Sequence, residues 1–298
     1  MNNVSRRTFC KTTGAIVLTT GLSYAGITDN AASAASVGEN AMLIDTRKCT
    51  GCRNCIKGCK SWNGHTFEEN KFKDAGNGLP RFSANQWIDV VTNWSEPLGN
   101  GEEGKPLFTR ISCMHCREAA CVMVCPVGAI NHNGLGAVVI DPQKCIGCNY
   151  CIANCTFNVI GFDRAANMAR KCTLCTDRVT AGMLPACVQA CPTDTLKFGP
   201  RNEIVRLVKT GVEEMNKEGN TQAAIYGLQE LNGLGMLYLL EEGLENSNIN
   251  YDLPENPSVS SAARAWNIIF KPFRTILVAA LAFALWANKG ASKIIKSQ

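Results

Sequence analysis

The stretch CIGCNYCIANC, from Cys145 to Cys155, places four cysteines with two, two and three residues between them. The spacing recurs in CTGCRNCIKGC, from Cys49 to Cys59, and two looser variants complete four sets of four. The sets, in chain order, are Cys49, Cys52, Cys55 and Cys59; Cys113, Cys116, Cys121 and Cys125; Cys145, Cys148, Cys151 and Cys155; and Cys172, Cys175, Cys187 and Cys191. They account for all but one of the 17 cysteines in 298 residues, so a cofactor or a cross-link is expected.

The spacing is typical of iron-sulfur proteins. Three thiolates at two-residue intervals can turn inward from one loop and hold three iron atoms of a 4Fe-4S cluster. A fourth cysteine lies on the helix that leaves the loop, faces away and serves a neighbouring cluster, as in bacterial ferredoxins. Pro126 and Pro192 follow the second and fourth sets, as in that motif. The sequence therefore predicts four 4Fe-4S clusters in two pairs, with all sixteen cysteines as iron ligands.

Other uses of cysteine fit the pattern less well. Zinc ribbons use two C-x2-C pairs for each ion, and these sets supply more ligands locally than one tetrahedral ion needs. Disulfides are common in exported proteins, but this chain is long enough for a hydrophobic core and its cysteines lie in tight local runs. A redox C-x-x-C pair explains two thiols and not sixteen.

The linkers between the sets indicate how they pair. Between Cys125 and Cys145, PVGAINHNGLGAVVIDPQK contains a turn and the alternating strand AVVID, as in a minimal two-cluster ferredoxin. The second and third sets are therefore predicted to pair. The first and fourth are then left for each other, although the short gap from Cys155 to Cys172 would also permit a pairing of the third set with the fourth.

The fold class expected is α+β, with two pseudo-symmetric bacterial-ferredoxin-like modules across residues 35–200. AMLIDTRKC and KPLFTRISC are predicted strands that lead into the first two sets, so each module should be a small antiparallel sheet with short helices. Residues 60–112, rich in Gly, Asn and charge, are predicted to form a surface insertion or docking element.

Residues 201–266 are expected to form a helical or extended C-terminal extension. Its first part, RNEIVRLVKTGVEEMNKEG, has helical periodicity, with Ile204, Val205, Val208 and Val212 on one face. That face is predicted to pack against the rest of the domain.

The first 34 residues carry the features of a twin-arginine export signal. SRRTFCK, from Ser5 to Lys11, precedes an apolar stretch and a cleavage pattern at Ala32 and Ala34. Cleavage after Ala34 would remove Cys10, the cysteine outside the four sets. The domain is therefore predicted to lie on the periplasmic face of the cytoplasmic membrane.

Residues 267–290 are predicted to form a single transmembrane anchor in the lipid bilayer. PFRTILVAALAFALWANKG is apolar around the whole helix, with Trp286 and Lys289 at its end. Residues 291–298 would then be a basic cytoplasmic tail. A buried core helix is the alternative interpretation.

The net charge of +5 does not indicate nucleic-acid binding, because its excess lies at the two ends of the chain. No dinucleotide fingerprint or nucleophile elbow is visible, so no catalytic residues are predicted. His115, inside the second set, is expected to pack beside a cluster rather than to carry a proton.

The four sets, with the fourth in KCTLCTDRVTAGMLPACVQACPTDTLKFG, resemble the iron-sulfur electron-transfer subunits shared by molybdopterin oxidoreductases, membrane formate dehydrogenases and some hydrogenases. The resemblance covers residues 42–200. It implies that the first set pairs with the fourth and the second with the third. The implied ligand groups are Cys49, Cys52, Cys55 and Cys191; Cys59, Cys172, Cys175 and Cys187; Cys113, Cys116, Cys121 and Cys155; and Cys125, Cys145, Cys148 and Cys151.

The export signal, GMLYLL (235–240), the tail ENSNINYDLPENPSVSSAARAWN (245–267) and the anchor further resemble the ferredoxin-like subunit of membrane-bound uptake nickel-iron hydrogenases. This resemblance implies a subunit that is not an enzyme on its own. Electrons would pass from the hydrogenase large and small subunits to a multispanning quinone-reactive membrane subunit, coupling hydrogen oxidation to quinone reduction. The alternatives are an electron-transfer subunit of a periplasmic molybdopterin oxidoreductase such as formate dehydrogenase, and an exported structural protein with disulfides or zinc.

Overall fold

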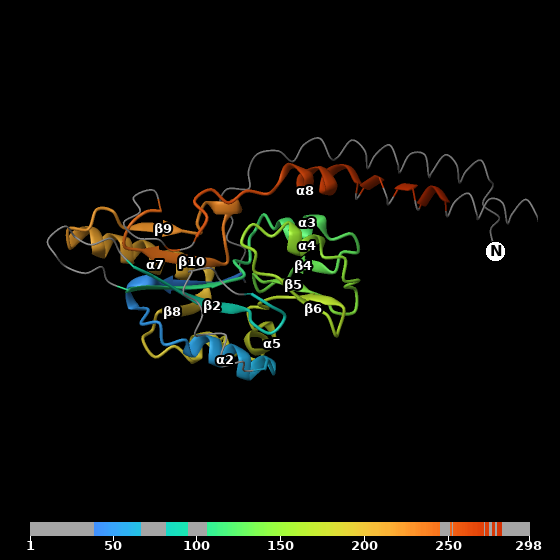
Figure 1. Ribbon diagram of the computed structural model, residues 1–298. Coiled ribbons are helices and arrows are strands. Elements are labelled where there is room, and N and C mark those ends of the chain that lie inside the picture. Colours follow the sequence, from blue (N-terminus) through green and yellow to red (C-terminus); the bar gives the residue numbers. More distant parts are fainter. Residues whose placement is uncertain are drawn as a thin grey trace, which may run out of the picture. The chain divides into compact units, whose positions relative to one another are not determined.

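A computed structural model describes residues 39–66, 82–94, 106–244, 251, 253–270, 272–273, 276–277 and 279–281 (Figure 1). The predicted export signal and basic tail lie outside the described residues, as do parts of 60–112 and of 267–290. All the described residues belong to one compact unit.

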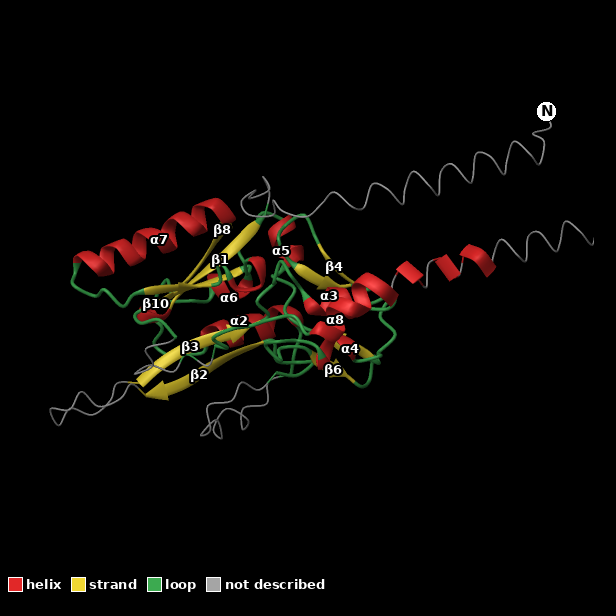
Figure 2. Ribbon diagram, turned by 90° about the horizontal axis from the view of Figure 1, so that it is seen from above, coloured by secondary structure: helices red, strands yellow, loops and turns green. Residues whose placement is uncertain are grey.

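A four-stranded sheet forms one side of the domain (Figure 2). Its strands, in spatial order, are β8 (Leu196–Pro200), β1 (Asn40–Asp45), β10 (Met236–Leu240) and β9 (Ala224–Tyr226). β1 runs antiparallel to β8 but parallel to β10, with Ile44 opposite Tyr238. The prediction of a purely antiparallel sheet is therefore wrong here, because a strand from beyond residue 200 enters beside β1.

Helix α7 (Arg201–Lys217) covers one face of this sheet. Ile204 and Val208 are buried against it, which confirms the predicted apolar face, and each contributes about 1.5 to 3 kcal/mol through burial. Alternate residues of β1 point to the opposite face, where Met42 and Ile44 join the core that contains the cysteines. The residues after 200 are thus packed into the cysteine domain itself.

The second and third cysteine sets lie in a smaller module built from two hairpins and two short helices. Its elements are β4 (Ile130–His132), β5 (Val138–Ile140), β6 (Gly161–Asp163), β7 (Met168–Arg170), α3 (Ala120–Val124) and α4 (Tyr150–Ala153). The predicted strand AVVID is β5. Helices α3 and α4 pack against each other.

The first and fourth sets lie in the other module, next to the four-stranded sheet. Its helices are α2 (Asn54–Asn63), α5 (Thr176–Thr180) and α6 (Ala186–Gln189), with the single turn η1 (Thr46–Lys48) before the first set. Helix α2 packs on α6 as α3 packs on α4, so the helix pairs carry the pseudo-symmetry while the sheets differ.

The segment predicted as a surface insertion contributes to the core. It forms the antiparallel strands β2 (Ile88–Trp94) and β3 (Pro106–Ser112). Ile88, Val90 and Ile111 are buried in the same core as the cysteines, which corrects the prediction for these residues. The Gly, Asn and charged residues that suggested a surface segment lie largely outside the described residues.

The C-terminal part begins with α8 (Ser261–Ala265), which packs against α3 and continues into the π-type turn η4 (Trp266–Phe270). The hydroxyl of Ser260 caps α8 by accepting a hydrogen bond from the Ala263 amide at 3.2 Å. Within the described ranges, no helix has the length and apolar character that crossing a membrane requires. Much of the predicted anchor lies outside those ranges.

Candidate functional site

Four cavities are each lined by four cysteines that come from two of the sequence sets. We name each cavity by one member. The Cys52 cavity is lined by Cys49, Cys52, Cys55 and Cys191; the Cys187 cavity by Cys59, Cys172, Cys175 and Cys187; the Cys116 cavity by Cys113, Cys116, Cys121 and Cys155; and the Cys148 cavity by Cys125, Cys145, Cys148 and Cys151. These groups coincide with those implied by the family resemblance. Ligation of iron by each thiolate stays a prediction.

The last cysteine of each set lines the cavity of the paired set, because a helix carries it away from the loop that holds the other three. Cys59 lies within α2 and lines the Cys187 cavity, whereas Cys191 follows α6 and lines the Cys52 cavity. Cys125 and Cys155, which follow α3 and α4, exchange in the same way. Each cavity thus needs both sets of its module, so the two sets must fold together.

The loops that carry the first cysteines share one backbone feature. In each opening C-x-x-C the third residue is left-handed, with φ of 67°, 48°, 70° and 56° at Gly51, His115, Gly147 and Leu174. A left-handed residue in such a turn directs successive backbone amides into one concavity, an arrangement found at many iron-sulfur sites. The loops can therefore offer amide donors to the sulfur atoms inside.

At Gly147 the loop has no room for a side chain, because the nearest neighbour is backbone. A Cβ there would lie 2.6 Å from the backbone oxygen of Asn167, in addition to the cost of φ 70°. We expect Gly147→Ala to lower the free energy of unfolding by about 2 to 5 kcal/mol and to reduce the iron retained. Anaerobic urea unfolding and iron analysis measure both.

Gly128→Ala is the matched control, since Gly128 has φ 65° but a Cβ added there would meet no atom within 4 Å. Its expected cost is about 1 to 2 kcal/mol, from the backbone conformation alone. Equal destabilisation by the two substitutions would contradict a tight loop at Gly147.

The cavities follow one another through shared residues. Arg110 lines both the Cys52 and the Cys187 cavity. Lys171 connects the Cys187 and Cys116 cavities through contacts described below, and a small apolar cluster that includes Cys125 and Cys151 joins the Cys116 and Cys148 cavities. Of the sixteen cysteines, all within the described ranges, only Cys52 and Cys148 are exposed. The exposed thiols therefore lie in the two end cavities.

Burial perturbs most of the thiols. It raises the pKa of Cys55, Cys121 and Cys151 to about 12 each. A thiol must lose its proton to bind iron, so the metal has to supply the stabilisation that burial removes.

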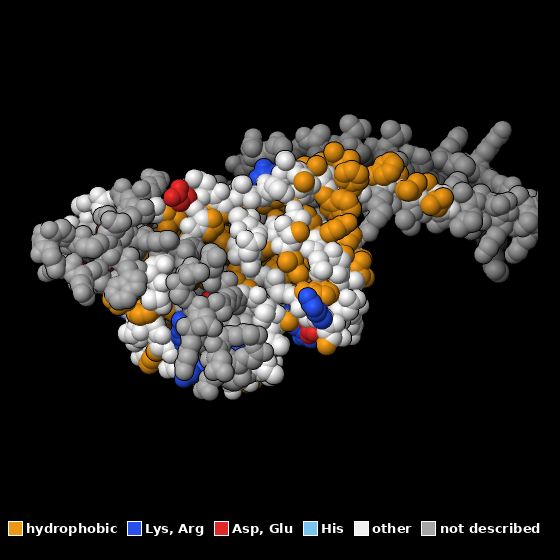
Figure 3. All heavy atoms as spheres, in the orientation of Figure 1, with side chains coloured by type: hydrophobic (Ala, Val, Ile, Leu, Met, Phe, Trp, Pro, Cys, Tyr) orange, Lys and Arg blue, Asp and Glu red, His pale blue; other side chains and the backbone are white. Residues whose placement is uncertain are grey.

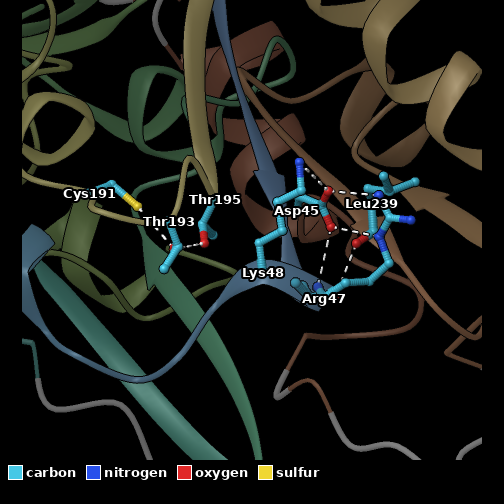
Figure 4. Close-up of polar contacts among 8 residues, drawn as sticks. Asp45, Arg47, Lys48, Cys191, Thr193, Thr195 and Leu239 are labelled. Carbon is cyan, nitrogen blue, oxygen red and sulfur yellow. Dashed lines mark hydrogen bonds and ion pairs between the residues drawn. The ribbon is translucent and has the colours of Figure 1, made fainter.

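Cys191 differs from these thiols because polar groups surround it (Figure 4). Burial raises its pKa, but hydrogen bonds from the backbone amide and hydroxyl of Thr193 and from the amides of Leu196 and Thr195 bring it below the usual value. The hydroxyl of Thr193 lies 3.7 Å from Cys191 Sγ and 2.8 Å from the hydroxyl of Thr195. This end of the Cys52 cavity is thus built to hold a thiolate.

Ion pairs to the buried carboxylate of Asp45 fix the turn before the first set. Asp45 accepts hydrogen bonds from Arg47, with Nη2 at 2.8 Å, and lies 3.6 Å from Lys48 Nζ (Figure 4). These pairs orient η1 and lead the chain into Cys49.

Two cations are buried between the cavities. Arg110 is 1% exposed, and its guanidinium donates to Ser112 Oγ at 2.7 Å and to Cys187 Sγ at 3.7 Å. Lys171 is 3% exposed, and its ammonium donates to Cys113 Sγ at 3.4 Å, to the carbonyl of Cys172 at 3.2 Å and to the carbonyl of Val138. Burial disfavours both charges, yet the neighbouring thiolates raise the pKa of each above its ordinary value.

The two buried cations indicate whether the cavities suit a negatively charged cofactor. A buried cation is costly unless an anion compensates it, and in the described part of the chain neither residue forms an ion pair with a carboxylate. Deprotonated thiolates around a metal group would supply that compensation. In the same part of the chain, no three Cys, His, Asp or Glu side chains converge to hold a single metal ion. The cavities therefore suit a larger group that spans four separated thiolates.

His115 is buried, with its Nδ1 accepting a hydrogen bond from the Val138 amide at 3.0 Å. Burial and the charges of Lys171 and Arg110 lower its pKa well below the usual value, so the ring is neutral. It lines a separate polar cavity, of about 230 Å³, together with Arg117 and Arg201. The ring is buried, and the cavity that it lines is this polar one; its packing beside a cluster stays a prediction.

Sequence reasoning missed Arg110 and Lys171. The available signal was a lysine immediately before the first cysteine of three sets, at Lys48, Lys144 and Lys171. Sequence alone does not show which of the three is buried.

Comparison with known proteins agrees with this geometry. The family model described as "4Fe-4S dicluster domain" matches residues 105–201, which include the second, third and fourth sets. The iron-sulfur subunit of the nitrate-inducible formate dehydrogenase of Escherichia coli K12 is 34% identical over 78% of this chain and 79% of its own length. The iron-sulfur subunit of formate dehydrogenase-O of the same organism is 36% identical over 81% and 80%. The thiosulfate reductase electron transfer subunit PhsB of Salmonella typhi is 37% identical over 63% and 89%.

The cofactors are 4Fe-4S clusters, and the cysteines suffice for four of them. Their removal is expected to lower the melting temperature by at least about 10 °C, because the buried thiols and two buried cations would lose the bound group that compensates them. Circular dichroism melts of the protein before and after anaerobic chelation measure the change. An unchanged melting temperature would mean that the clusters do not support the fold.

Proposed function

We propose that this chain, which belongs to the 4Fe-4S iron-sulfur subunits of molybdopterin oxidoreductases, carries electrons between a catalytic subunit of formate dehydrogenase type and the membrane. The chain is an electron-transfer subunit of a multi-subunit oxidoreductase and is not catalytic alone. The observation that carries the proposal is the continuous series of four cysteine-lined cavities with exposed cysteines only at its ends.

The relatives favour the formate dehydrogenase alternative over the hydrogenase subunit expected from the tail. Two of the relatives described above are formate dehydrogenase subunits, one is a thiosulfate reductase subunit, and none is named as a hydrogenase subunit. Of the features that suggested hydrogenase, the export signal and much of the anchor lie outside the described residues. The hydrogenase partners are therefore retained only as an outcome of the experiment below.

The chain's own residues provide the conditions for electron transfer. Bound 4Fe-4S clusters supply one-electron oxidation and reduction at each cavity. The helices α2, α6, α3 and α4 hold the thiolates, the left-handed loops direct amides inward, and the core excludes water from the two interior cavities. With clusters bound, these residues would hold neighbouring one-electron sites that exchange single electrons.

The two ends of the series differ in chemistry. Arg53 lines the Cys52 cavity, and the exposed Lys48 and Lys57 lie next to its cysteines in the sequence, so this end is polar and basic. Around the Cys148 cavity it presents Ile146 and Tyr150, which are 56% and 49% exposed. We assign the polar end to the soluble catalytic subunit and the apolar end to the membrane subunit.

The C-terminal segment supports the same polarity. The ring of Tyr150 makes an edge contact with Trp266, centroids 6.0 Å apart, so η4 lies beside the Cys148 module. Within η4 and beyond it, many described side chains are apolar and exposed, and Figure 3 shows apolar side chains gathered over this part of the surface. The exposed members are Ile268, Ile269, Phe270, Phe273, Ile276, Leu277 and Leu281. In this proposal they begin a membrane anchor, and export by the twin-arginine route places the domain in the periplasm.

Anaerobic capture of the full-length chain from gently solubilised membranes, followed by mass spectrometry, tests the proposal. A molybdopterin subunit and a multispanning membrane protein should be recovered together with it. Recovery of hydrogenase large and small subunits instead would overturn the formate dehydrogenase assignment while leaving the electron-transfer role intact.

A further inference from the structure

Three of the four cysteine sets are preceded by a lysine, and the three lysines have different surroundings. The side chains of Lys48 and Lys144 are 45% and 60% exposed and pair with Asp45 and Asp141. Lys171 is 3% exposed, and no carboxylate pairs with it within the described ranges. The same sequence position is therefore a surface ion pair in two sets and a buried cation in the fourth.

The ammonium of Lys171 lies where the two modules meet. It donates to Cys113 Sγ, which lines the Cys116 cavity, and to the carbonyl of Cys172, which lines the Cys187 cavity. A third contact, to the carbonyl of Val138, fixes the side chain from β5. One positive charge thus serves both interior cavities.

Arg110 occupies the preceding junction. It is buried on β3, lines the Cys52 and Cys187 cavities, and donates to Cys187 Sγ at 3.7 Å. The Cys187 cavity is therefore in contact with both cations, the Cys116 cavity with Lys171 and the Cys148 cavity with neither.

A fixed positive charge near a redox group stabilises the reduced form, which carries one more negative charge, and so raises its reduction potential. The effect is strong where water is excluded, because screening is weak there. Hydrogen bonds to the cysteine sulfur act in the same direction.

We propose that Lys171 raises the reduction potentials of both interior clusters above those of the two end clusters, and so favours entry of the electron into the pair of clusters where the two modules meet. Arg110 adds to this effect at the Cys187 cavity. The inference rests on the proposed electron-transfer function and goes beyond it, because it names the residue that sets the order of the potentials.

Redox titration of the full-length protein, followed by electron paramagnetic resonance, tests the inference without any partner subunit. In Lys171→Met, two of the four clusters should shift to lower potential while the other two keep theirs. Lys171→Arg retains a buried cation and should restore the potentials. Lys144→Met is the matched control, since Lys144 also precedes a first cysteine but is exposed, and it should leave all four unchanged.

Iron and spin quantitation must first show four clusters in the variant. If Lys171→Met loses a cluster, Lys171→Gln carries the test, because its amide can still donate to Cys113 Sγ without the charge. Potentials that stay in place, or that all shift alike, would overturn the inference. A wild-type protein without cluster signals would instead overturn the electron-transfer function itself, so the two failures are distinguishable.

Discussion

Replacing Cys187 by serine is expected to stop electron transfer through the chain while the protein still folds. Cys187 is 5% exposed and lines an interior cavity that shares Arg110 with the Cys52 cavity and is joined through Lys171 to the Cys116 cavity. Because the cavities are connected in series, no described route bypasses this one. Changes in outer partners of metal sites already reduce activity by about 10- to 100-fold, so loss of a ligand should exceed that range. Substrate-driven quinone reduction by the assembled complex measures it.

Lys144→Met is the control, because it changes an exposed side chain beside a cysteine set and leaves every cysteine in place. It should keep four clusters and the full rate. The Cys187→Ser protein should keep three clusters that dithionite can reduce, which separates a broken series from a failure to fold. A full rate of quinone reduction in Cys187→Ser would mean that electrons do not pass through all four sites.

Serine substitutions at the two exposed cysteines are expected to give opposite patterns. With Cys52→Ser, the catalytic subunit should no longer reduce the remaining clusters of this chain, because that end is the one proposed to receive electrons. With Cys148→Ser, substrate should still reduce the remaining clusters, but quinone should stay oxidised because the exit is missing. Electron paramagnetic resonance after addition of substrate, with and without quinone, distinguishes the two cases.

Both variants change exposed thiols, so neither leaves a cavity in a packed core. The two variants can therefore be compared without a difference in core packing. If Cys148→Ser blocked reduction by substrate and Cys52→Ser did not, the polarity assigned from the basic and apolar rims would be reversed.

The parts of the site that sequence could predict are those set by local spacing. The interval between cysteines in CIGCNYCIANC fixes which thiols share a loop and which one leaves on a helix, and the same rule applies to all four sets. The period of Ile204 and Val208 likewise predicts a helix with one buried face, which α7 confirms.

Pairings between distant segments could not be predicted in this way. The strand β10 enters the sheet parallel to β1 although nearly 200 residues separate Ile44 from Tyr238. The hairpin of β2 and β3 was assigned to the surface because its flanking residues are polar, whereas its own apolar residues are buried among the cysteines. Local composition does not report such contacts.

The sequence does not show which charged side chains are buried. Lys144 and Lys171 stand in equivalent positions, yet one pairs with Asp141 at the surface and the other lies between two cavities. The difference arises because β5, through the Val138 carbonyl, closes over Lys171. Only the packing of the two modules against each other reveals it.

We expect the sixteen cysteines to hold four 4Fe-4S clusters in one chain. Mössbauer spectroscopy of anaerobically purified, iron-57-enriched protein, combined with iron and acid-labile sulfide analysis, measures this number. The expected result is four 4Fe-4S clusters per chain and no other iron species. Fewer clusters in fully loaded protein, or zinc without sulfide, would contradict it.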